Sequence, residues 1–234
     1  MITVIVPVFN EENTIRKILL KIINLKVKKQ IIVIDDASHD KTSFEIQKIK
    51  KKFKNIKIIR HKKNQGKGSA IRSAQKHILG DITIIQDADL EYSPQDYLKL
   101  IKPILQKKSL VVYGSRFLNM RYKKKKIFIS KLRIIANILL TKLSNFINNQ
   151  NLTDAHTCYK VFESKFFKSF NLQEKRFGFC PEITTKISNN KIKIIEIPIW
   201  YNGRSHSDGK KISFLDGIRA IYCILKYKFY GIKK

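Results

Sequence analysis

The stretch Ile82-Thr83-Ile84-Ile85-Gln86-Asp87-Ala88-Asp89-Leu90-Glu91 decides the fold of this chain. Its first four residues are apolar or β-branched, which is typical of a buried strand. The strand ends in carboxylates at i and i+2, with a third two residues later. Open α/β sheets bind ligands beyond the carboxyl ends of their strands, and a hard divalent cation takes one or two carboxylates plus substrate oxygens. The stretch therefore predicts a metal site, and a solvated acidic loop is the alternative.

The N-terminal half of the chain alternates short apolar runs with amphipathic helical segments. The predicted strands are residues 2–9, 31–34, 56–60, 82–85 and 110–113. Alternation of this kind indicates an α/β fold with a mostly parallel central sheet, right-handed crossovers and helices on both faces. The second half is less regular, but no linker or internal repeat interrupts it, so we expect a single domain over residues 1–234.

Charged residues follow the predicted strands rather than being scattered. All of them lie at carboxyl ends of strands, and therefore on one rim of the sheet: Glu11, Asp35, Asp36, Lys67, Asp87, Asp89 and Arg116. Because parallel strands share that rim, these side chains are expected to meet in one site. This shared location favours the metal site over the solvated loop.

The chain is strongly basic, with 48 Lys and Arg against 18 Asp and Glu and a net charge of +30. Two explanations are open. One is a phosphate-rich partner such as nucleotide-linked substrates or an anionic membrane, and the other is a genome biased towards Lys, Ile and Asn codons. A nucleic-acid partner is not expected, since the basic residues are not interleaved with aromatic residues and no recognition helix is apparent.

The cysteines and the N-terminal residues indicate the cellular compartment in which the protein is expected. The three cysteines form no C-x-x-C pair, which favours inert thiols in a reducing compartment over a disulfide framework or zinc site. The chain starts directly with a strand, and no uncharged apolar stretch is long enough to span a membrane. We expect a cytoplasmic protein.

Six segments occur in an order that carries a resemblance. They are residues 7–11 (PVFNE), 35–38 (DDAS), 64–68 (NQGKG), 87–89 (DAD), 114–116 (GSR) and 154–160 (DAHTCYK). Together they resemble the family 2 glycosyltransferases, and most of all the dolichyl- and polyprenyl-phosphate sugar transferases such as dolichyl-phosphate mannosyltransferases. The resemblance implies a GT-A type fold, a nucleotide-sugar donor and Mg²⁺ or Mn²⁺. It divides the domain into a nucleotide-binding half (1–116), an acceptor half (117–211) and a C-terminal amphipathic helix (212–234).

The resemblance also assigns roles to residues. The metal ligands it implies are Asp89, Glu91 and Asp87. The donor-binding residues it implies are Pro7, Phe9, Glu11, Asp36, Lys67, Asp87 and Arg133. The catalytic residues and phosphate clamps it implies are Asp89, Arg116, Asp154, Arg204 and Lys211. The relatives usually carry Gln at the position of Glu91, and the segment 204–211 carries its Ser displaced and a second Lys.

The acceptor decides the mechanism. A hydroxyl acceptor needs a general base, for which Asp154 and Glu182 are candidates, whereas a polyprenyl phosphate is already anionic. We expect an inverting transferase that moves a hexose from GDP-mannose or UDP-glucose to a polyprenyl or dolichyl phosphate. The alternative is transfer to a saccharide or protein hydroxyl in surface-glycan assembly. Basic amphipathic segments at 121–147 and 213–234 predict peripheral contact with the cytoplasmic face of a membrane; the oligomeric state stays open.

Overall fold

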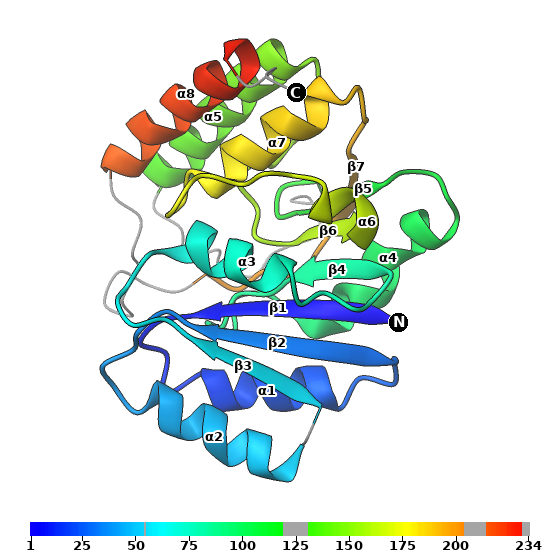
Figure 1. Ribbon diagram of the computed structural model, residues 1–234. Helices are drawn as coiled ribbons and strands as arrows, with labels where there is room; N and C mark the ends of the chain where they lie inside the picture. The colour runs from blue at the N-terminus through cyan, green and yellow to red at the C-terminus, as the bar shows by residue number, and fades with distance from the viewer. Residues whose placement is uncertain (54, 119–130, 204–213, 231–234) are drawn as a thin grey trace.

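The structure is a computed structural model that describes residues 1–53, 55–118, 131–203 and 214–230. Within these residues the chain forms one seven-stranded sheet in the order β3-β2-β1-β4-β6-β5-β7 (Figure 1). The strands are β1 (Ile2–Val8), β2 (Lys29–Asp35), β3 (Ile56–Arg60), β4 (Ile82–Ile85), β5 (Val111–Ser115), β6 (Lys160–Glu163) and β7 (Ile195–Pro198). The sheet therefore draws strands from both predicted halves of the domain.

The sheet is mostly parallel, as the alternating pattern predicted. β1 lies between β2 and β4 and pairs in parallel with both, and β2 pairs in parallel with β3. β6 pairs antiparallel with β4 on one side and with β5 on the other, and β5 pairs in parallel with β7. All seven residues of β1 are buried, because a central strand of an α/β sheet is covered on both faces.

The helices fill the connections. They are α1 (Ile15–Ile23), α2 (Thr42–Lys52), α3 (Lys67–Gln75), α4 (Tyr97–Leu105), α5 (Lys131–Asn148), α6 (Ser164–Lys168), α7 (Phe179–Asn189) and α8 (Phe214–Phe229), with a short 3₁₀ turn η1 (Pro94–Asp96) before α4. α3 packs on β1 and β2, whereas α4 packs on β5 and β6. α5, α7 and α8 pack on one another and form the layer at the top of Figure 1.

Two element boundaries differ from the sequence-based prediction, and one short helix was missed. The sequence pattern predicts a helix that reaches Leu79, but α3 ends at Gln75. It also predicts a strand over residues 192–197, of which β7 covers only residues 195–197. The short α6 was not predicted. Five residues are too few for a helical period to stand out in a sequence, and edge strands such as β7 are shortened by the limits of their single pairing partner.

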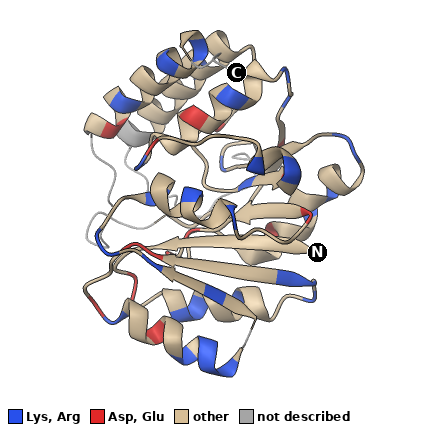
Figure 2. Ribbon diagram, in the orientation of Figure 1, with Lys and Arg blue, Asp and Glu red and all other residues tan. Residues whose placement is uncertain are grey.

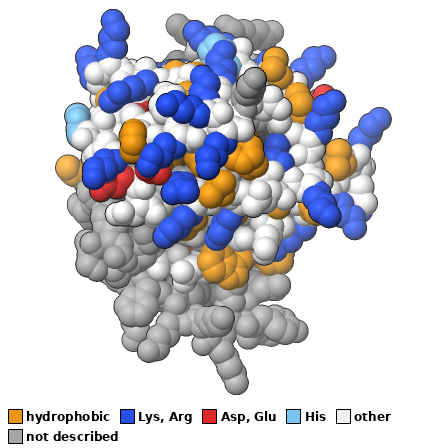
Figure 3. Space-filling view, turned by 90° about the horizontal axis from the view of Figure 1, so that it is seen from below, with side chains coloured by type: hydrophobic (Ala, Val, Ile, Leu, Met, Phe, Trp, Pro, Cys, Tyr) orange, Lys and Arg blue, Asp and Glu red, His pale blue; other side chains and the backbone are white. Residues whose placement is uncertain are grey.

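Basic charge is widely distributed. Lys and Arg lie on helices and strands throughout the fold, and they are scattered over the face seen from below, where α1 and α2 lie (Figures 2 and 3). This spread fits the compositional explanation of the net charge for that face. In the part of the chain that the structure describes, no helix has the length and apolar character needed to cross a membrane.

Candidate active site

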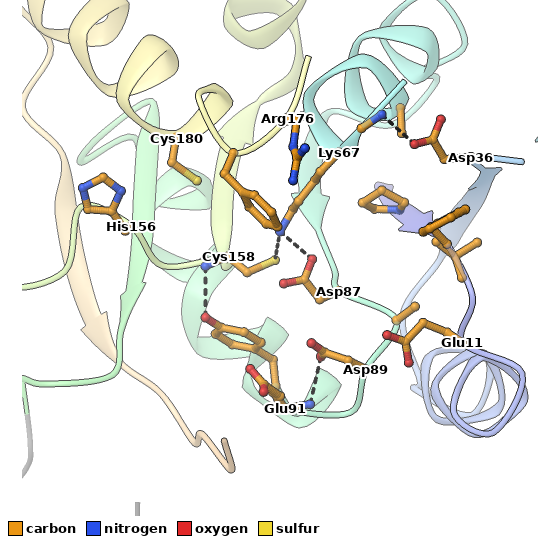
Figure 4. A pocket seen from close by; sticks show the side chains of 18 of the residues that line it. Glu11, Asp36, Lys67, Asp87, Asp89, Glu91, His156, Cys158, Arg176 and Cys180 are labelled. Carbon is orange, nitrogen blue, oxygen red and sulfur yellow. Dashed lines mark hydrogen bonds and ion pairs between the residues drawn. The ribbon is translucent and has the colours of Figure 1, made fainter. Parts of the chain in front are cut away.

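A pocket of about 480 Å³ lies beyond the carboxyl ends of β1, β2 and β4 (Figure 4). It is where the strand-end argument placed the site. The predicted residues that line it are Pro7, Phe9, Glu11, Asp36, Lys67, Asp87, Asp89, Glu91 and Arg116. Of the remaining predicted residues, Asp154 lies behind the pocket wall. Arg204 and Lys211 lie outside the described residues, as does the side chain of Arg133 at the start of α5.

The end of β1 turns Phe9 and Glu11 towards the pocket. Asn10 between them has a positive φ of 52°, a conformation that Asn tolerates better than most residues. The Glu11 carboxylate accepts a hydrogen bond of 2.7 Å from the Thr14 hydroxyl, and its backbone N–H donates to Thr42 Oγ1 at 2.8 Å. Glu11 therefore both faces the pocket and lies beside the first turn of α1.

Asp36 organises the loop after β3. Its carboxylate accepts from the backbone N–H groups of Gln65 and Gly66 at 2.9 and 2.6 Å, and contacts His61 Nδ1 at 2.6 Å. The residue is almost fully buried. Its side chain thus holds the segment that leads into α3, in addition to lining the pocket.

The two glycines around Lys67 are required by close packing. A Cβ on Gly66 would lie 2.6 Å from the carbonyl oxygen of Lys175, and one on Gly68 would lie 2.3 Å from that of Glu174. Gly66 also has a φ of +87°, which favours glycine. The Gly-Lys-Gly segment therefore lets the start of α3 lie against residues 174–176, which fixes the direction of the lysine between them.

Lys67 reaches across the pocket to the end of β4. Its Nζ lies 2.5 Å from Asp87 Oδ1 and 3.3 Å from Cys158 Sγ. Burial is the largest single influence and lowers the pKa of Lys67. The charge of Asp87 and the hydrogen bond to it, together with Cys158 and Cys180, outweigh burial and hold that pKa well above the ordinary lysine value. The lysine is therefore a permanent cation, and it neutralises one of the three carboxylates at this strand end.

The other two carboxylates differ in surroundings. Asp89 is partly exposed to the pocket, and its Oδ1 accepts from the backbone N–H of Glu91 at 3.1 Å. Glu91 is buried, and its Oε2 accepts from the Tyr201 hydroxyl at 2.8 Å. Leu90 between them has a positive φ of 64°, which turns the chain sharply at this point. Asp89 is thus the more accessible of the two.

Arg116 is held in place by Asp154. Its Nε and one terminal nitrogen each donate to the Asp154 carboxylate at 2.7 Å, and its backbone N–H donates at 3.1 Å. Asp154 is fully buried, while 15% of the Arg116 side chain is exposed. Burial is the largest single influence and raises the pKa of Asp154. The charge and hydrogen bonds of Arg116, together with the charge of Lys160, outweigh burial and hold the pKa below its ordinary value. This bidentate pair orients the guanidinium at the pocket wall.

The two candidate general bases, Asp154 and Glu182, each have a cation as partner and are not among the residues that line the pocket. Asp154 is engaged by Arg116. Glu182, also fully buried, accepts from the backbone N–H groups of Gln173 and Glu174 and from Lys186 Nζ at 2.6 Å. Both carboxylates are therefore already engaged, Asp154 by a guanidinium and Glu182 by an ammonium group and loop backbone.

Sequence reasoning missed two polar residues that line the pocket, His156 and Arg176. Burial lowers the pKa of His156 to about 4, so its imidazole is neutral, and its Nε2 has no hydrogen-bond partner among the described residues. Arg176 precedes α7 and lies 3.9 Å from Asp216. His156 falls within one of the six segments and was open to detection. Arg176 lies in an irregular segment without any local signal.

The α/β sheet and the pocket at the carboxyl ends of its strands define a protein of the GT-A fold class. The family model "Glycosyl transferase family 2" matches residues 3–170, so the chain belongs to glycosyl transferase family 2. This finding confirms the family that the six segments indicated.

Curated relatives align along nearly the whole chain. It is 28% identical to the UDP-N-acetylglucosamine–dolichyl-phosphate N-acetylglucosaminyltransferase of Methanococcus voltae, over 97% of this chain and 96% of that protein. It is 27% identical to the dolichol-phosphate mannosyltransferase of Pyrococcus furiosus, over 97% of this chain and 64% of that protein. The names of these two relatives specify different sugars, N-acetylglucosamine and mannose.

Solved structures confirm the fold. Glucosyl-3-phosphoglycerate synthase from Mycobacterium tuberculosis, solved with Mn²⁺, UDP-glucose and phosphoglyceric acid, matches with a TM-score of 0.68 at 16% identity, over 100% of this chain and 81% of that chain. A mannosyltransferase from Pyrobaculum calidifontis, solved with GDP-mannose and Mn²⁺, matches with a TM-score of 0.58 at 17% identity, over 84% of this chain and 54% of that chain.

Proposed function

We propose that this family 2 glycosyltransferase moves a sugar from a nucleotide sugar to the phosphate of a polyprenol or dolichol at the cytoplasmic face of a membrane. The observation that carries the proposal is the pocket itself. It combines carboxylates at the end of β4 with guanidinium groups from two other segments, Arg116 and Arg176. A nucleoside diphosphate bound through a metal needs this pairing of acids and cations. The curated relatives support the lipid-phosphate acceptor.

The donor set of the pocket fits a divalent metal. Asp89 offers carboxylate oxygens to the pocket, with Asp87 and Glu91 on either side of it. Among the described residues no group of three or more His, Cys, Asp or Glu side chains converges closely enough to hold a metal by itself. Mg²⁺ and similar hard cations commonly bind one or two carboxylates together with substrate phosphates. Asp89 would be the principal ligand, and the cation would stabilise the charge of the departing diphosphate.

The reaction is an in-line displacement at the anomeric carbon. A phosphate oxygen of the acceptor forms a bond to that carbon, and the bond from the carbon to the donor diphosphate breaks with its electron pair. The nucleoside diphosphate leaves, and the configuration inverts. Arg116, oriented by Asp154, and Arg176 would stabilise phosphate charge on the donor or the acceptor. Lys67 would hold Asp87 in place beside the donor.

The state of the two candidate bases favours a phosphate acceptor over a hydroxyl acceptor. A phosphate monoester is anionic near neutral pH and attacks without losing a proton to the protein, whereas a hydroxyl needs a base within hydrogen-bond reach. Asp154 and Glu182 are each engaged by a buried cation. Transfer to a saccharide or protein hydroxyl therefore needs a base from elsewhere in the pocket.

The test is transfer of label from radioactive nucleotide sugars into an organic phase. The purified protein is incubated with Mn²⁺ or Mg²⁺, one labelled donor (GDP-mannose, UDP-glucose or UDP-N-acetylglucosamine), and either polyprenyl phosphate or the matching polyprenol without phosphate. We expect label in the lipid with one donor and only with the phosphorylated acceptor. Label in the unphosphorylated polyprenol would support a hydroxyl acceptor. Absence of lipid label with every donor would refute the proposal.

A further inference from the structure

Helix α5 has the reverse of the side-chain arrangement expected for a helix on a water-exposed surface. Along its described side chains, the buried positions are polar, namely Thr141, Ser144 and Asn148. The exposed positions are largely apolar, namely Ile135, Ile138, Leu139 and Phe146. A surface helix of a water-soluble protein shows the opposite arrangement, with its apolar stripe turned to the core. Phe146 is 89% exposed, which leaves a whole aromatic ring in water unless something covers it.

Hydrogen bonds fix this orientation. Asn137 donates to Asp154, and Thr141 accepts from the backbone of Ala155. Asn145 makes two bonds to the backbone of Leu152, of 2.7 and 3.0 Å. At the far end of the helix, Asn148 Nδ2 donates to Thr185 on α7 at 3.1 Å. Turning α5 to bury its apolar side would break these bonds inside the protein, so the apolar side is held outwards.

Helix α8 continues the same surface. Its buried stripe of Ala220, Cys223, Ile224 and Tyr227 packs inwards. A second apolar stripe, spaced alternately three and four residues apart, is exposed: Leu215, Ile218, Tyr222, Leu225 and Phe229. α8 packs against α5, and the two helices lie together at the top of Figure 1. We define these exposed apolar residues of α5 and α8 as the outer face.

The exposed charges beside the outer face are positive, because the two acids near it are mostly buried. Among the side chains that the structure describes on the two helices, the basic ones are Lys142, Arg219, Lys226 and Lys228. Arg219 and Lys226 pair with the buried Glu174, which precedes α7. The described part of α5 contains no acid, and the one acid of α8, Asp216, has a side chain only 13% exposed, near Arg176. An apolar surface bordered by cations matches the interface of an anionic bilayer. Two copies of it would repel each other, and the net charge of +30 adds to that repulsion.

We infer that the outer face of α5 and α8 is a docking surface for an anionic lipid bilayer, and that it places the acceptor phosphate at the pocket. The placement of the acceptor phosphate rests on the proposed function. The membrane docking rests only on the outer face. Apolar side chains enter the acyl boundary, while Lys142 and Lys228 contact lipid phosphates, and Arg219 and Lys226 stay paired with Glu174.

The outer face is joined to the pocket by two contacts. Asp216, in the first turn of α8, lies 3.9 Å from Arg176, which lines the pocket. Asn137 of α5 donates to the Asp154 carboxylate that holds Arg116. A bilayer lying on α5 and α8 would therefore have its headgroup layer near the two guanidinium groups that face the reaction. A phosphate at headgroup depth reaches them while its polyprenyl chain stays in the membrane.

The test uses the whole chain and two double variants. Leu139→Glu with Leu225→Glu places carboxylates on the outer face at positions that are 61% and 43% exposed. The matched control, Leu98→Glu with Leu105→Glu, makes the same change on α4, at positions 61% and 66% exposed. Binding is measured by flotation with phosphatidylcholine vesicles that contain or lack about 30 mol% phosphatidylglycerol. Transfer is measured with a long-chain acceptor in vesicles and with a short, water-soluble polyprenyl phosphate.

We expect the wild type and the α4 control to bind anionic vesicles, and the outer-face variant to bind at least about tenfold more weakly, because it loses apolar insertion and gains repulsion. That variant should keep transfer to the water-soluble acceptor and lose it in vesicles. Equal vesicle binding by all three proteins overturns the inference. The inference is also overturned if light scattering shows that the wild type is a dimer and the outer-face variant is a monomer. Vesicle binding without transfer to either acceptor overturns the proposed function and leaves the docking surface intact.

Discussion

The ion pair between Arg116 and Asp154 gives the sharpest test of the site. Asp154→Asn keeps the shape of the side chain but removes the charge that compensates a guanidinium with only 15% of its side chain exposed. Loss of one partner of a buried pair costs about 3–5 kcal/mol. Asn can still accept one hydrogen bond, so we expect about 3 kcal/mol. For a chain of this size that lowers Tm by about 6–12 °C.

A matched control exists in the same protein. Glu182 and Lys186 form an ion pair with nearly the same burial, 0% and 14% exposed, on α7. Glu182→Gln should lower Tm to a similar extent because it too leaves a buried cation uncompensated. It should leave turnover of the remaining folded enzyme near the wild-type value. Asp154→Asn should in addition lower kcat/KM by about 10- to 100-fold, because Arg116 is no longer oriented.

The measurements are thermal unfolding by circular dichroism and initial transfer rates across a range of pH. If Asp154 were a general base, its loss would remove the acidic limb of the pH–rate profile. If it positions Arg116, the limb stays and the whole profile is lowered. A Tm within about 2 °C of wild type, or a lost acidic limb, would refute the positioning role.

Three further predictions follow from the same contacts. The stability difference between wild type and Asp154→Asn should be full above pH about 4, the unfolded pKa of Asp, and should shrink as pH falls further, because the folded pKa is depressed; urea unfolding at several pH values measures it. Asp89→Ala should weaken Mn²⁺-dependent binding of the nucleoside diphosphate at least about tenfold and change Tm little, since the side chain is partly exposed; thermal shift with and without Mn²⁺ checks it. Gly68→Ala should cost about 1–3 kcal/mol because its Cβ would lie 2.3 Å from the Glu174 carbonyl, whereas Gly217→Ala, with open space on α8, should be neutral or stabilising by up to about 1 kcal/mol; chemical denaturation compares them.

The sequence determined the elements and the rim on which the site lies. A strand such as residues 82–85 can be predicted from its own sequence, because a run of apolar and β-branched residues is a local pattern. Parallel strands then bring their carboxyl ends to one edge, so Glu11, Lys67 and Asp89 were correctly expected to share a pocket. The ordered motifs also identified the family before any contact was known.

Only the tertiary structure decided what those residues contact. The antiparallel insertion of β6 between β4 and β5 brings Asp154 against Arg116, 38 positions away along the chain. The same is true of α5. Its periodicity defines a polar side and an apolar side. Which side faces the protein depends on hydrogen bonds to Leu152, which precedes β6, and to Thr185, which lies on α7. Those partners are set by strand order and helix packing, which depend on free energies summed over the whole chain and not on any local segment.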